Sequence, residues 1–81
     1  MIDIKITYNS DQYDRLSDSV KKGIENTLNS VKQTIMKFEQ EIKKSNGRII
    51  IQVSQKIDID LEDMPQELID RITESVNQAS N

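Results

Sequence analysis

The residues best suited to chemistry in this sequence are carboxylates that lie close together in its second half. They are Asp58, Asp60, Glu62 and Asp63. Clustered carboxylates bind calcium or magnesium, but an EF-hand loop that began at Asp58 would need glycine at its sixth position and glutamate at its twelfth. Those positions hold Asp63 and Ile69. Because three of the four acids alternate with apolar residues, we assign them to a solvated strand face and to helix capping, and we predict no metal site.

The amino acids missing from the chain argue against catalysis. It contains neither histidine nor cysteine, which removes the commonest general base, the commonest transition-metal ligand and all thiolate chemistry. Carboxylate pairs at glycosidase distances are easy to find by chance, and no aromatic residue neighbours these acids to hold a sugar. Gly23 and Gly47, the two glycines, are too few for a phosphate-binding loop. We therefore predict that the protein is not an enzyme and binds no cofactor.

A second candidate site is a compact group of basic residues, called the basic corner below. Its members are Lys37, Lys43, Lys44 and Arg48. They could contact phosphate groups or an acidic partner. However, the chain has a net charge of −3, and its three aromatic residues fall on apolar stripes, where they cannot stack on bases. Basic side chains also suit the end of a helix, which explains the lysines without a ligand. We therefore do not expect nucleic acid as a partner, and we keep a nucleic-acid- or ribosome-associated factor as the alternative hypothesis.

A long amphipathic helix over residues 10–46 must position most of these side chains, because apolar residues recur there at spacings of three and four. The stripe consists of Tyr13, Leu16, Val20, Ile24, Leu28, Val31, Ile35, Phe38 and Ile42. Asn9 and Gln12 form a capping box at its start, and Gly47 suits a left-handed cap at its end. Such a helix would be about 50 Å long, whereas a compact chain of this size has a radius of gyration of about 12 Å. It must protrude, pack against a partner chain or break, and Gly23 is its weakest point.

Strands with a two-residue period flank this helix. Residues 1–9 alternate isoleucine with polar residues, and between 47 and 62 the apolar residues hold odd positions, apart from Ile50. This parity predicts antiparallel pairs whose numbers sum to 110, such as Arg48 with Glu62. The same rule fits a hairpin with a three-residue loop, or one continuous strand paired with its copy across a two-fold axis at Gln55. Because the loop lacks the glycine or asparagine that such hairpins favour, we slightly favour the swapped dimer.

After the strands, a capping box at Asp63 and Gln66 predicts a short helix over residues 63–77, followed by a frayed tail at 78–81. The sequence thus predicts a single α+β domain over residues 1–81. Its order is strand, long amphipathic helix, two strands (a hairpin or one continuous strand swapped across a dimer) and short C-terminal helix. The helices cover a small sheet that contains antiparallel strands.

Charge is distributed unevenly along the chain. Residues 21–56 hold eight basic and three acidic residues, whereas residues 57–81 hold seven acidic and one basic. These opposed blocks, the helix length and the strand edges favour a homodimer. The amino terminus lacks the apolar run of a signal peptide or membrane span, so we expect a cytoplasmic protein with no membrane contact. The leading hypothesis is a small, acidic, self-associating protein-binding module, a regulator or inhibitor that occupies the surface of an unidentified protein partner, with a phage or mobile element as a guess at its origin.

Overall fold

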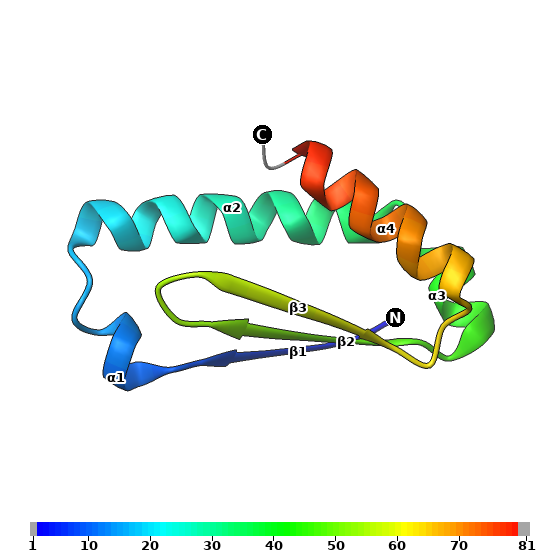
Figure 1. The fold of residues 1–81 in the computed structure, drawn as a ribbon, viewed down its shortest axis with the longest axis horizontal. Coiled ribbons are helices and arrows are strands. Elements are labelled where there is room, and N and C mark those ends of the chain that lie inside the picture. Colours follow the sequence, from blue (N-terminus) through cyan, green and yellow to red (C-terminus); the bar gives the residue numbers. More distant parts are fainter. Residues whose placement is uncertain (1, 80–81) are drawn as a thin grey trace.

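The computed structural model describes residues 2–79, which form a three-stranded sheet with helices packed on one of its faces (Figure 1). In chain order the elements are β1 (Asp3–Tyr8), α1 (Ser10–Tyr13), α2 (Asp18–Met36), α3 (Glu39–Ser45), β2 (Arg48–Val53), β3 (Ile57–Glu62) and α4 (Gln66–Ala79). The predicted fold class is confirmed: a strand, a long helix, two strands and a C-terminal helix surround a small sheet.

The central strand of the sheet is β2, with β1 and β3 on either side. It pairs in parallel with β1, because the helices between them carry the chain back to the end of the sheet where β1 begins. It pairs antiparallel with β3 in the register that the alternation predicts, with Ile51 beside Ile59 and Arg48 beside Glu62. The parallel register places Ile6 beside Ile51. Apolar residues of all three strands therefore share the face that the helices cover.

The strands β2 and β3 form a hairpin within one chain, closed by a turn at residues 54–56. The continuous strand across a dimer axis at Gln55, which the sequence slightly favoured, does not form, and Gln55 is the middle residue of the turn. The backbone amide of Ser54 closes the turn by donating to the carbonyl of Lys56 at 2.9 Å. Within residues 2–79, the non-glycine residues with a positive φ are Asn46 and Asp63. Because the turn uses no left-handed residue, its lack of glycine does not count against the hairpin.

The long helix is present as α2, but it begins later than residue 10. Residues 14–17 separate it from the single turn α1. The hydroxyl of Ser17 caps α2 by accepting a hydrogen bond from the amide of Val20 at 3.3 Å. An N-cap side chain satisfies an amide that the helix itself leaves without a partner, which explains the start at this serine. Gly23, the expected weak point, lies inside α2 without breaking it.

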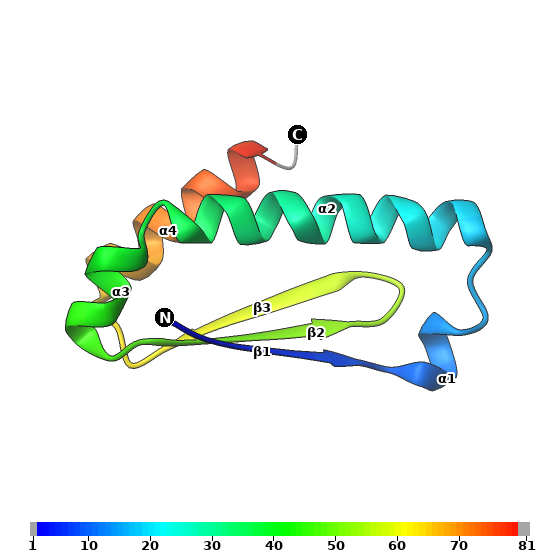
Figure 2. The same ribbon diagram turned by 180° about the vertical axis from the view of Figure 1, so that it is seen from behind.

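A second interruption at residues 37–38 bends the chain between α2 and α3. The backbone of Phe38 leaves the helical region, with φ −103° and ψ 12°. The segment α3 then turns toward the sheet (Figure 2), where Ile42 is fully buried. At the bend, the Arg71 guanidinium lies 5.6 Å from the Phe38 ring centroid and donates to the Glu41 carboxylate at 2.8 Å. The molecule is 39 Å long, shorter than the unbroken helix would be, so helix length no longer argues for a second chain.

The core lies between the helix-covered face of the sheet and the apolar sides of α2, α3 and α4. Its most deeply buried members are Leu28, Val31, Ile35, Ile42, Ile49, Ile51, Val53 and Ile72. Burying such a side chain stabilises the fold by about 1.5–3 kcal/mol. The buried hydroxyl of Thr34 donates to the carbonyl of Ser30 at 2.9 Å, which satisfies its polar atom. No described helix covers the opposite face of the sheet (Figures 1 and 2).

The predicted caps at both ends of the helical region are corrected. Asn9 is an N-cap, but of the single turn α1 and not of the long helix, and its own amide donates to the carbonyl of Val53 rather than to the side chain of Gln12. Asn9 caps α1 by accepting a hydrogen bond from the amide of Gln12 at 3.4 Å. At the end of α3, Asn46 adopts the left-handed conformation, with φ 57° and ψ 36°, and Gly47 does not. The glycine is needed for space instead, because a Cβ at this position would lie 2.5 Å from Cγ of Met64.

The start of the last helix is also corrected. Asp63 has a left-handed φ of 61°, and its carboxylate lies 3.3 Å from Nε of Arg48. The helix α4 therefore begins at Gln66 rather than at residue 63, and it continues to Ala79. Of the predicted frayed tail, residues 80–81 lie outside the described residues, as does residue 1 of the predicted first strand.

Candidate protein-binding surface

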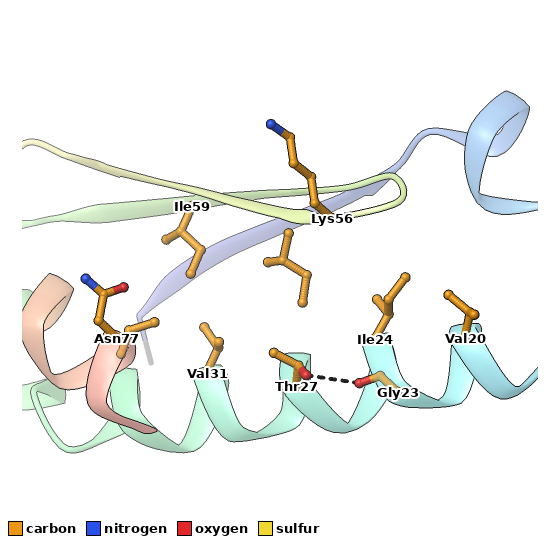
Figure 3. A pocket seen from close by; sticks show the side chains of 10 residues that line it. Val20, Gly23, Ile24, Thr27, Val31, Lys56, Ile59 and Asn77 are labelled. Atoms are coloured by element: carbon orange, nitrogen blue, oxygen red, sulfur yellow. Dashed lines mark hydrogen bonds between the residues drawn. The ribbon is translucent and has the colours of Figure 1, made fainter. Parts of the chain in front are cut away.

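A groove runs along the helix side of β3, between the N-terminal half of α2 and the end of α4 (Figure 3). Its larger part has a volume of about 550 Å³. The apolar lining is formed by Val20, Ile24, Val31, Ile57, Ile59 and Val76, with Gly23, Thr27, Lys56 and Asn77 between them. A second hollow of about 360 Å³ between β3 and α4 shares Ile57, Ile59, Val76 and Asn77 with the first. The two hollows form one depression, called the β3 groove below.

The groove stays open because of the direction of α4. Leu68 and Ile72, in the first half of α4, are buried, but the C-terminal end of the helix rises away from the sheet (Figures 1 and 2). Ile57 and Ile59 therefore remain half-buried, although they lie on the helix-covered face. On the opposite wall, Val20 is 46% exposed. An apolar surface that the rest of the described chain leaves open is typical of an interaction site.

Gly23 leaves open space in the wall that α2 contributes. A Cβ at this position would meet no heavy atom within 4 Å, so packing does not demand a glycine here. The Gly23 carbonyl accepts a hydrogen bond from the hydroxyl of Thr27 at 3.0 Å, as Figure 3 shows. Glycine costs a helix interior about 1 kcal/mol relative to alanine. Because Gly23 has no side chain, the groove is wider at this point than it would be with any other residue.

The opposite face of β3 carries the acidic residues that stand out in the sequence. Asp58, Asp60 and Glu62 alternate with the isoleucines that face the groove. Glu62 pairs with Arg48 at 2.8 Å, and Asp58 lies 3.9 Å from Lys56. The Asp60 carboxylate forms no hydrogen bond or ion pair with any residue in the described range 2–79. One strand thus presents apolar side chains on one face and incompletely neutralised acids on the other.

Acidic neighbours neutralise half of the basic corner. The ion pairs are Lys43–Glu39 at 3.1 Å, Arg48–Glu62 at 2.8 Å and Arg48–Asp63 at 3.3 Å. Lys37 and Lys44 form no ion pair with a described residue, but Lys37 follows α2 whereas Lys44 lies in the last turn of α3. The four side chains therefore do not form one cluster of free cations. This arrangement favours a structural role for Lys43 and Arg48 over contact with phosphate groups.

Two tyrosines fasten the N-terminal half of α2 to the end of the sheet. The hydroxyls of Tyr8 and Tyr13 both donate to Oε1 of Glu25, at 2.9 and 3.0 Å. Their rings pack edge to face with centroids 5.0 Å apart. Partial burial, followed by the hydrogen bond and the negative charge of Glu25, raises the pKa of both tyrosines. Because the phenols stay neutral, they anchor the helix that forms one wall of the groove rather than act as bases.

The β3 groove could not be identified from the sequence, which predicts only that helices cover the sheet. The alternation along β3 is the one signal that pointed to it, since it separates an apolar from an acidic face. Residues 2–79 contain no group of three histidine, cysteine, aspartate or glutamate side chains placed to hold a metal ion. None of the helices in that range is both long and apolar enough to cross a membrane. Comparisons with protein-family models, curated protein sequences and solved structures find no match to this chain.

Proposed function

We propose that this protein is a non-catalytic protein-binding module that holds a partner in the β3 groove. The observation that carries the proposal is an apolar groove beside the edge of β3, a strand that has a neighbour on one side only within the described sheet. Strand edges bind other chains through main-chain hydrogen bonds, while pockets beside them select side chains. In this protein β3 supplies both the exposed strand edge and part of the lining of the groove.

The chemistry of the groove supports binding rather than catalysis. The polar residues that line its larger part are Thr27, Lys56 and Asn77, and the smaller part adds Asp58, Asp60 and Thr73. The Thr27 hydroxyl is engaged with a backbone carbonyl, and the Lys56 side chain points away from α2 (Figure 3). Catalysis needs several polar groups that converge on one reacting atom. Apolar side chains instead gain free energy when a partner removes them from water.

A regulator or inhibitor that occupies a partner's surface is the role we propose for such a module. Self-association was expected from the helix length, the loop without glycine, the strand edges and the opposed charge blocks, and the first two of these features have an explanation within one chain. We therefore propose that the partner in the groove is a different protein and not a second copy of this chain. The homodimer stays a prediction, which light scattering at micromolar concentration would test.

The proposal is tested by filling the groove without disturbing the fold. The Gly23→Leu variant would place a side chain in the open space of the groove wall, and Gly23→Ala is the matched control with a single methyl group. Both variants and the wild type are immobilised and exposed to a lysate of the source organism, and the captured proteins are compared by quantitative mass spectrometry. We expect proteins that wild type and Gly23→Ala retain and Gly23→Leu loses. Equal capture by all three, or none above bare resin, would refute the proposal.

A further inference from the structure

We infer that the β3 groove binds an extended segment of another protein in which apolar side chains alternate with lysine or arginine, added as a fourth strand beside β3. This inference rests on the proposed function and specifies the chemistry of the partner. It follows from the two faces of one edge strand. Ile57 and Ile59 face the groove, whereas Asp58 and Asp60 face the other side of the sheet.

The edge of β3 is protected against added strands by acidic side chains alone. Natural edges are blocked by very short strands, by charged side chains, above all lysine, by proline or by bulges. The strand β3 has six residues, and neither proline nor lysine is among them. It also pairs with β2 without a bulge, since the register is the same from Arg48–Glu62 to Val53–Ile57. The other edge strand, β1, carries Lys5 near its centre. Of the two edges, β3 is the better template for a new strand.

The acidic residues decide which strand can be added. If a second copy of β3 paired antiparallel about Asp60, the two Asp60 side chains would oppose each other and Asp58 would oppose Glu62. Like charges directly opposite each other destabilise an antiparallel pair, which disfavours a dimer through β3. Asp60 has no ionic partner among the described residues, and Asp58 has one at 3.9 Å between two exposed side chains. Lysine or arginine at the opposing positions would pair with both acids.

The two-residue period of a strand determines the rest of the pattern. Successive side chains of an added strand point to opposite faces. Those opposite Ile57 and Ile59 would enter the groove, against Val20, Ile24 and Val76. The partner segment is therefore apolar, basic, apolar and basic in turn. The four residues 57–60 correspond to about 13 Å of extended chain.

The test uses a capped, fluorescently labelled peptide, Ser-Ile-Lys-Val-Lys-Ile-Ser, and the intact protein, with binding followed by fluorescence anisotropy. Three matched peptides carry glutamate in place of lysine, the same residues with apolar and basic groups separated, or N-methyl groups on the amides that would bond to β3. We expect each change to weaken binding by about tenfold or more. Salt should weaken binding of the parent peptide, because exposed charges are screened. On binding, the amide resonances of residues 57–60 should shift.

Protein variants separate the contribution of the acids from that of the fold. Asp60→Asn should weaken binding of the lysine peptide several-fold, whereas Asp11→Asn, which changes an exposed acid in α1, should not. Far-ultraviolet circular dichroism confirms that both variants are folded. If the lysine peptide binds equally to Asp60→Asn and wild type, or if the N-methylated or separated peptide binds as well as the parent, strand addition by an alternating basic segment is overturned.

The remaining outcomes distinguish this inference from the proposed function. If the lysine peptide does not bind at millimolar concentration but Gly23→Leu still loses cellular partners, the chemistry of the partner is wrong and the proposed function stands. If the peptide fails and the capture experiment also fails, both are refuted. A concentration-dependent dimer that Gly23→Leu abolishes would identify a second copy as the occupant and would overturn the inference.

Discussion

Replacing Gly47 with alanine would test whether the junction between α3 and β2 is closed by direct contact with the segment before α4. The added methyl group would lie 2.5 Å from Cγ and 3.1 Å from Cε of Met64, and 3.2 Å from Cγ2 of Ile42. Carbon atoms in contact prefer separations of about 3.5–4.0 Å, so Met64 would have to move by about 1 Å. The fully buried Ile42 has little room to retreat. Overpacking of this kind costs about 1–3 kcal/mol, and no backbone strain adds to it because Gly47 does not have a positive φ.

A loss of this size is easily measured. A chain of this length is stable by about 4–12 kcal/mol, and each kcal/mol lost lowers the melting temperature by about 4–8 °C. Urea unfolding followed by circular dichroism would compare wild type, Gly47→Ala, Met64→Ala and the double variant. We expect alanine at position 47 to cost at least about 1 kcal/mol less when Met64 is truncated, because residues in contact are coupled. Unfolding of Gly47→Ala within about 0.5 kcal/mol of wild type, or an equal cost in both backgrounds, would refute the steric reasoning.

Gly23→Ala should stabilise the protein by about 0.5–1 kcal/mol, since the residue is helical and its new Cβ meets nothing within 4 Å; a lower urea midpoint would contradict this. Ile51→Ala, in the fully buried centre of the sheet, should cost about 2–5 kcal/mol, and an unchanged midpoint would show that the core lies elsewhere. The raised pKa of Tyr8 and Tyr13 means that folding favours their neutral forms. Their contribution to stability is therefore present below about pH 10 and is lost as the pH rises through the folded-state pKa. The urea midpoint should fall in that range, and Glu25→Gln should make the fall smaller; a fall of equal size would argue against the role of this carboxylate.

The hairpin register could be predicted from alternation because a slip of one residue would move every apolar side chain of β3 to the wrong face. The same rule placed Arg48 beside Glu62, which form an ion pair at 2.8 Å. How the two strands are connected could not be predicted. Parity is identical for a hairpin and for two copies related about Gln55, and the turn at residues 54–56 closes through a backbone hydrogen bond that any residue type except proline can donate.

The interruptions of the helix and the groove depend on contacts between elements distant in sequence. The apolar spacing continues through residues 14–17 and 37–38, so periodicity carries no sign of either break. At the bend, Phe38 contacts Arg71 from α4, which is 33 positions away in the sequence. The groove depends on the direction in which α4 leaves the sheet. The hydrophobic pattern shows which side of α4 is buried but not the angle between α4 and the sheet. Composition identified the basic corner, and strand parity placed Glu62 beside Arg48. The second acid beside Arg48, Asp63, could not be predicted, because its position depends on a left-handed backbone conformation.

The parallel pairing of β1 with β2 has a consequence for the order of folding. Asp3 pairs with Arg48, 45 positions away, whereas Val53 pairs with Ile57, four positions away. Loop-closure entropy makes the longer closure about 2 kcal/mol more costly, so we expect the hairpin to form first and β1 to dock late. The residues of β1 are at best half-buried, so the same strand should detach first, with faster amide hydrogen exchange than β2. In each such opening β2 becomes an edge strand, and the frequency of these openings limits how long β2 stays protected from pairing with other chains.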